Sequence, residues 1–218
     1  MKKIGILLTV IALASVAQAA LKPGDSLTPY EIKNVETGKQ YCQVCAYGAK
    51  PGKVVAFGKL NDELAAGDIK GELYLVGGAV MCLAHAARQS TEDVDAYFRP
   101  AREVREAAAR IAARSGVPAD WLNDAVKGYL SERGDYRPWL ELSHLRVMVA
   151  QPAYLLAMKC LAFRIGAEFH DEDDVRFLLR LLDIRSYAKA LETITHYYPQ
   201  ERFPQKTLYA LGELLPEA

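Results

Sequence analysis

The stretch that decides the fold is residues 73–98, which read LYLVGGAVMCLAHAARQSTEDVDAYF. The pattern begins as an apolar strand, turns at Gly77-Gly78, continues as a short helix and ends in a second strand with Asp93 and Asp95. Residues i and i+2 of a strand point to the same face of a sheet, so these two carboxylates stand side by side. Adjacent carboxylates repel each other unless a cation lies between them, which indicates a divalent metal.

The double glycine permits a close approach of the backbone, and the helix after it offers unpaired N–H groups to an anion. Metal ligands beside an anion site predict a site for a nucleoside triphosphate such as ATP. The alternatives are an ordinary strand-to-helix turn for the glycines and a solvated strand end for the aspartates. Tyr97 and Phe98 favour a buried sheet over the solvated end.

Length and composition allow one ordinary domain or two small ones, because the chain has 218 residues and 51% of them are hydrophobic. The 27 Lys and Arg residues balance the 27 Asp and Glu residues, so the formal net charge is zero. Composition therefore gives no general argument for binding nucleic acid and no DNA-binding signal. Any contact with RNA would have to use a local patch.

Residues 1–20 have the layout of a secretory signal peptide. Lys2 and Lys3 precede an apolar run from Ile4 to Val16, and Ala17-Gln18-Ala19 gives the small-x-small pattern of a cleavage site. The alternative is a retained membrane anchor, although the run is short against the roughly 20 residues of a membrane span. The leader predicts export to the periplasm or the extracellular space.

Residues 21–58 carry Cys42 and Cys45 as a Cys-x-x-Cys pair, followed by a predicted strand from Val54 to Phe57. With the leader and the LKPGD opening, this stretch resembles the N-terminal part of exported thioredoxin-like proteins. The rest of such a domain does not follow, so we expect a truncated fragment in a short, partly disordered arm. The pair is then a redox site, a simple disulfide or two idle thiols.

The remaining residues, 59–218, are predicted to form an α/β (α+β) domain, with a small mixed sheet and a helical C-terminal half. We expect Cys82 and Cys160 to be core cysteines, since both lie in apolar helical runs without ligands at metal-binding spacing. The expected elements are helix 59–66, strand 72–76, helix 79–88, strand 93–98, helices 102–114 and 118–132, strand 139–150, and helices that begin near residues 152, 171, 186 and 206.

The Gly-Gly and Asp-x-Asp pattern resembles the active-site motif of the nucleotidyltransferase superfamily. WLNDAVKGYL (121–130), PWLELSHLRVMVAQPAYLLAMKCLAFR (138–164) and DEDDVRFLLRLL (171–182) extend the similarity to a bacterial family of uncharacterised nucleotidyltransferase-like proteins. That family is related to abortive-infection and toxin–antitoxin nucleotidyltransferases. The resemblance covers roughly residues 59–218.

This resemblance implies that Gly77 and Gly78 cradle the triphosphate and that Asp93 and Asp95 bind Mg²⁺. A third carboxylate usually completes such a site from a neighbouring strand. Glu141 is the candidate, because an acid on a mostly apolar strand face needs a partner.

Asp124 is the alternative third acid. The resemblance also implies that Lys159, the only charge between Pro152 and Phe163, neutralises phosphate; the alternative is a lysine that snorkels to solvent. Asp173 or Asp174 lines the site or, as acids in a first helical turn, caps a helix. The histidines have no metal-binding spacing and receive no role: His85, His144, His170 and His196.

The predicted function is Mg²⁺-dependent transfer of NMP from an NTP to a hydroxyl on an RNA end, a protein side chain or a small molecule. A role as a toxin with an antitoxin partner is a further expectation from the resemblance. The alternatives are an exported redox or disulfide protein that uses Cys42 and Cys45, and an inactive hybrid joined near residues 57–59. NTP chemistry fits the cytoplasm, whereas the leader predicts export.

Overall fold

The computed structural model describes residues 31–33, 40–42, 53–87, 91, 93–115, 118–164 and 170–215. The chain divides into two compact units, Met1–Lys50 and Pro51–Ala218. In the first unit, β1 (Glu31–Lys33) pairs antiparallel with β2 (Gln40–Cys42). Cys45 and the predicted leader lie outside the described residues.

The second unit contains a mixed five-stranded sheet in the order β5-β4-β3-β7-β6. β3 is antiparallel to β4 and parallel to β7, β5 is parallel to β4, and β6 is antiparallel to β7. The C-terminal end of β3 therefore meets the beginning of β4, where Leu75 pairs with Ala96. The strands are β3 (Gly71–Leu75), β4 (Val94–Arg99), β5 (Leu122–Asn123), β6 (Tyr136–Glu141) and β7 (Leu145–Ala150).

One face of this sheet is covered by α2 (Lys53–Ala66) and α4 (Ala101–Ser115). Alternate residues of β3 and β4 are buried on that face, as the period of a strand requires. Gly71 lies so close to both helices that an added Cβ would stand 2.7 Å from Leu64 of α2 and 3.5 Å from Val104 of α4. The intervening residues of both strands therefore point to the opposite face.

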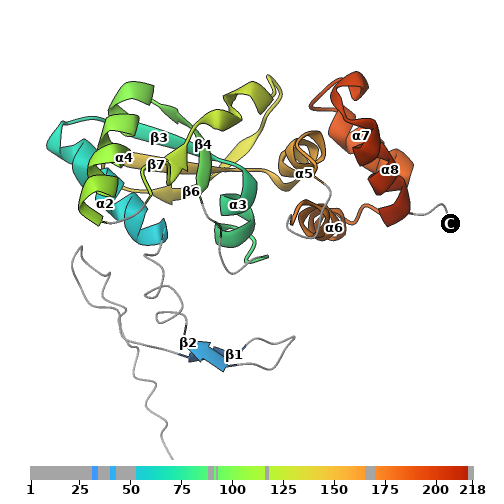
Figure 1. Ribbon diagram of the computed structural model, residues 1–218, viewed down its shortest axis with the longest axis horizontal. Helices are drawn as coiled ribbons and strands as arrows, with labels where there is room; N and C mark the ends of the chain where they lie inside the picture. The colour runs from blue at the N-terminus through green and yellow to red at the C-terminus, as the bar shows by residue number, and fades with distance from the viewer. Residues whose placement is uncertain are drawn as a thin grey trace, which may run out of the picture. The chain divides into compact units, whose positions relative to one another are not determined.

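The C-terminal half is helical and forms a group beside one end of the sheet (Figure 1). α5 begins with proline at its first position and is buried along most of its length. Ser186 caps α7 by accepting a hydrogen bond from the backbone N–H of Lys189. The helices are α5 (Pro152–Leu161), α6 (Asp171–Leu181), α7 (Tyr187–Thr195) and α8 (Gln205–Leu214), with a short 3₁₀ helix, η2 (Gln200–Arg202), before α8.

A cluster of packed tyrosines connects the helical half to the sheet. The buried Tyr154 ring of α5 lies 5.5 Å from Tyr136 of β6 and 5.1 Å from Tyr197 beyond α7. Its hydroxyl accepts a hydrogen bond from the Ser131 backbone N–H. Gly134 allows this packing, because a Cβ there would stand 2.6 Å from the Tyr154 ring. The cluster thereby fixes α5, which carries Lys159, relative to the strands.

The structure confirms the predicted fold class, a mixed sheet with a helical C-terminal half. The predicted strand from Val54 to Phe57 is wrong, because these residues belong to α2. Phe57, Leu60 and Leu64 are buried at helical spacing, so α2 continues across the predicted boundary at residues 58 and 59.

The predicted helix over 118–132 is also wrong: this segment forms β5 and a 3₁₀ helix, η1 (Ala125–Tyr129). Leu122 and Asn123 pair with β4, while the Trp121 indole donates a hydrogen bond to the carbonyl of Ala108. Sheet pairing and this tertiary contact override the helical spacing of the apolar residues.

The predicted single strand over 139–150 is two strands, β6 and β7, joined by a turn at Ser143 and His144. The Asn61 side chain of α2 accepts hydrogen bonds from the backbone N–H of His144 and from the Ser143 hydroxyl. None of the helices in the described ranges combines the length and apolar character that crossing a membrane requires.

Candidate functional site

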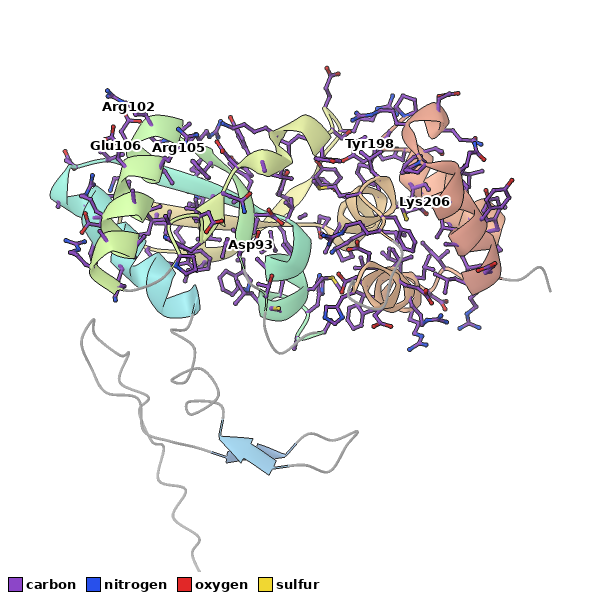
Figure 2. The ribbon with its side chains drawn as sticks, viewed as in Figure 1. Asp93, Arg102, Arg105, Glu106, Tyr198 and Lys206 are labelled. Atoms are coloured by element: carbon purple, nitrogen blue, oxygen red, sulfur yellow. The ribbon has the colours of Figure 1, made fainter. Side chains whose placement is uncertain are left out.

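The two predicted carboxylates lie where β4 begins, next to α3 (Gly77–Leu83). Figure 2 labels Asp93 at this position. Asp95 follows the buried Val94, so its side chain points away from the face that α2 and α4 cover. Asp93 immediately precedes β4 and shares this direction. Burial raises the pKa of Asp95, and the neighbouring Asp93 raises it further. The pair is therefore a crowded anionic site.

Gly77 lies directly against this pair. Its φ of 61° is in the left-handed region, and an added Cβ would stand 2.8 Å from Oδ2 of Asp95. The backbone N–H of Val76 also donates to the Asp95 carbonyl at 3.1 Å. The glycine thus allows a close approach of the Asp95 side chain, whereas the triphosphate contact of Gly77 and Gly78 stays a prediction. Gly78 occupies the first turn of α3, which is seven residues long.

Replacing Gly77 by alanine tests this contact. Gly77→Ala is expected to lower the free energy of unfolding by about 1–3 kcal/mol, because the new Cβ strains the backbone and displaces Asp95. Urea denaturation measures the loss. Gly212→Ala is the control, because a Cβ at Gly212 meets nothing within 4 Å and lies in α8. Equal stability of the two variants would contradict the account.

The prediction that Glu141 supplies the third acid is wrong. Glu141 lies opposite Arg146 in the hairpin, and Arg146 pairs with Glu72, whereas the aspartates lie at the other end of β3 and β4. Its carboxylate accepts two hydrogen bonds from Arg146, at 2.8 and 3.2 Å, and is exposed. The turn at residues 143 and 144, which the sequence pattern did not reveal, causes this displacement.

Asp124, the alternative acid, is held by other partners. It forms ion pairs with Lys127 at 2.5 Å and Arg105 at 2.6 Å, and the Lys127 hydrogen bond is the main cause that lowers its pKa. The residue that reaches the pair is its neighbour Asn123, whose Nδ2 donates to Oδ2 of Asp93 at 3.1 Å. Its Oδ1 accepts from the backbone N–H of Ala125, which fixes the amide.

Lys159 lies in a buried ion-pair network between α5 and α6. Its Nζ is 2.7 Å from Oδ2 of Asp174 and 3.2 Å from Oδ1 of Asp171, and its side chain is 11% exposed. The snorkelling alternative is therefore excluded. Arg164, which sequence reasoning missed, donates from Nε to Oδ2 of Asp171 at 2.9 Å. Asp174 is buried in this network, whereas Asp173 is exposed.

The cations of this network interact electrostatically with the aspartate pair. The charges of Lys159 and Arg164 act to lower the pKa of Asp95, against the larger effects of burial and Asp93. In turn, the Asp171 hydrogen bond raises the pKa of Arg164, and Asp95 and Asp93 add to that rise. Lys159 and Arg164, which are paired with Asp171 and Asp174, thus also interact electrostatically with the carboxylates of the sheet.

The residues at this site fit a magnesium ion better than zinc. Within the described ranges, no group of three or more His, Cys, Asp or Glu side chains is arranged to hold a metal. Mg²⁺ binds proteins through one or two carboxylates and completes its shell with water and substrate phosphates. Asp93 and Asp95 are two such carboxylates, and a bound cation would offset the repulsion by Asp93, which adds to burial in raising the pKa of Asp95.

Cys82 and Cys160 are not among the predicted residues of the carboxylate site. Cys160 is buried, as predicted, and burial raises the pKa of its thiol to about 12. Cys82 is half-buried. A separate cavity of about 440 Å³ lies between α5 and α7, away from the carboxylate site. It is lined by Ala153, Lys189, Glu192, Thr193, Thr195, His196 and Tyr197.

Comparison of the chain with protein-family models, with curated proteins and with solved structures found no match. Support for a function therefore comes from the residues of the site and their geometry.

Proposed function

We propose that the chain is a Mg²⁺-dependent nucleotidyltransferase, which moves NMP from an NTP to a hydroxyl acceptor. The observation that carries this proposal is the pair Asp93 and Asp95, with Gly77 packed against Asp95 and with electrostatic interactions from Lys159 and Arg164. Carboxylates for a hard cation and separate cations for phosphate are the two requirements of nucleoside triphosphate chemistry.

Asp93 and Asp95 are the residues that would hold Mg²⁺. When bound there, Mg²⁺ supplies Lewis-acid stabilisation of phosphate charge and lowers the pKa of a coordinated hydroxyl. Asn123 keeps Asp93 in place through its 3.1 Å hydrogen bond. A third carboxylate would not be required, because Mg²⁺ in proteins usually keeps several waters and also binds substrate phosphates.

Lys159 and Arg164 would bind the β- and γ-phosphates. In the reaction, the acceptor oxygen bonds to the α-phosphorus and the bond between the α-phosphorus and the α–β bridging oxygen breaks. Pyrophosphate leaves with that bridging oxygen, and the acceptor proton passes to water. The role of the two side chains is to neutralise the charge that develops on the leaving pyrophosphate. Asp171 and Asp174 hold the Lys159 ammonium in place through ion pairs of 3.2 and 2.7 Å.

We further propose that this chemistry takes place where NTP and Mg²⁺ are available, as in the cytoplasm. The predicted leader, the Cys42 and Cys45 pair and the expectation of an antitoxin partner stay predictions. Cell fractionation, combined with sequencing of the mature N-terminus, decides the compartment.

Ligand-induced stabilisation tests the proposed site. Mg²⁺ with ATP at about 100 times its dissociation constant should stabilise the full chain by about 2.7 kcal/mol, and Asp95→Asn should lose most of this gain. Without ligand, Asp95→Asn should be at least as stable as wild type. The raised pKa of Asp95 means that ionising this carboxyl in the folded chain costs stability at neutral pH. Thermal melts measure both effects, and an equal ligand shift in wild type and variant would refute the proposed site.

A further inference from the structure

The face of the sheet opposite α2 and α4 carries tyrosines with arginine between them. Tyr74 of β3 pairs in register with Tyr97 of β4, and their ring centroids are 5.8 Å apart at an interplanar angle of 40°. Tyr136 of β6 lies edge-on to Tyr74 at 5.1 Å. The Arg99 guanidinium lies over the Tyr74 ring, 5.5 Å from its centroid. The result is a row of aromatic rings from β4, β3 and β6, which extends over the intervening β7.

This tyrosine face is partly exposed, and its two arginines are balanced by two glutamates. Tyr74 and Tyr97 are half-buried, while the side chains of Arg99 and Arg146 are 59% and 51% exposed. Both arginines form ion pairs with Glu72, and Arg146 also pairs with the exposed Glu141. Exposed pairs of this kind contribute little to stability, so these arginines can exchange a carboxylate for a phosphate of a ligand.

The tyrosine face is continuous with the carboxylate site. Asp95 and Tyr97 are two residues apart on β4 and point to the same face, which places their Cα atoms about 6.6 Å apart. Arg99 follows at the same spacing in the same direction. A ligand lying along β4 therefore meets a guanidinium, then a ring, and then the carboxylates where transfer is proposed to occur.

We infer that the tyrosine face binds the end of a single-stranded nucleic acid, which presents its terminal ribose or deoxyribose hydroxyl to Asp93 and Asp95 as the acceptor. This inference rests on the proposed function for the identity of the acceptor. Aromatic side chains on a sheet, with arginines for the backbone, are how proteins hold single strands, because every base has a face that stacks. Because the net charge of the chain is zero, contact with nucleic acid would have to use a local patch such as this face.

Binding of short oligonucleotides, measured without NTP, tests the inference independently of catalysis. A 5′-fluorescein single-stranded RNA of about 10 nucleotides, a DNA of the same sequence and a blunt RNA duplex are titrated with the full chain, and anisotropy is recorded. The single strand should bind more tightly than the duplex. Tyr97→Leu, which removes a ring but keeps apolar bulk, should weaken binding about tenfold.

Two matched variants separate stacking from folding. Tyr97→Phe keeps the ring and should retain wild-type affinity, while Tyr209→Leu removes the 72% exposed tyrosine of α8 and should change nothing. Stabilisation by Mg²⁺ and ATP should be the same in Tyr97→Leu as in wild type. This measurement distinguishes a loss of nucleotide binding from a loss of oligonucleotide binding. Equal affinity of Tyr97→Leu and Tyr97→Phe, preference for the duplex, or labelling of a protein acceptor with no oligonucleotide binding would overturn the inference.

Discussion

Asp93→Asn should reduce nucleotidyl transfer by roughly 10³-fold, because removing one of two carboxylates that hold a catalytic cation costs several kcal/mol of transition-state stabilisation. The substitution keeps the size of the side chain and its position at the start of β4. The rate is measured as pyrophosphate released from ATP in the presence of Mg²⁺ and a single-stranded RNA, with wild type alongside.

Glu141→Gln is the matched control for this prediction. It removes a carboxylate from the same sheet, at the far end of β6, where the charge is paired with Arg146. Its rate should remain within about twofold of wild type, since exposed ion pairs are weak. Equal rates for Asp93→Asn and wild type, or a larger loss in Glu141→Gln, would place the chemistry elsewhere.

Lys159→Met should lower the free energy of unfolding by about 3–5 kcal/mol, the typical cost of removing one member of a buried ion pair. Asp174, which is 2% exposed, loses its ion pair at 2.7 Å, while Asp171 keeps Arg164. The double variant Lys159→Met with Asp174→Leu should recover much of this loss, because an apolar pair of similar volume replaces the ions. Urea denaturation of all three chains measures the coupling.

Lys189→Met is the control for Lys159→Met, because the pair of Lys189 with Glu192 is exposed and should contribute less than about 1 kcal/mol. The pH dependence gives a second readout. Burial raises the pKa of Asp171, but the Arg164 hydrogen bond and the charge of Lys159 outweigh it, so the pKa is lowered overall. Its stabilising contribution is present above the ordinary carboxyl pKa and is lost as the pH falls through the lower folded value. The gap between wild type and Lys159→Met should therefore narrow in acid.

Local patterns in the sequence predicted the parts of the site that depend on neighbours along the chain. Asp93 and Asp95 share a face because they are two residues apart in a strand, and Gly77 was singled out as a point of close approach. Lys159 stood out as a single charge in an apolar helix, and the structure places it in a buried network.

Parts of the site that depend on strand register were not predicted. Asn123 was missed because the apolar spacing of residues 118–132 favoured a helix, whereas pairing with β4 makes Asn123 a strand residue beside the aspartates. Glu141 was misplaced because the turn after β6 is held by Asn61, more than eighty positions earlier in the chain. Tyr74 and Tyr97 become one surface only when β3 and β4 pair.

The position of the transferred phosphate tests the central claim most directly. Wild-type chain is incubated with Mg²⁺ and single-stranded RNA, and with ATP labelled at either the α- or the γ-phosphate. A nucleotidyltransferase should transfer the α-label to the acceptor and release the γ-label as pyrophosphate, with both signals lost in Asp93→Asn. Transfer of the γ-label, or α-label transfer that is equal in wild type and Asp93→Asn, would contradict the account.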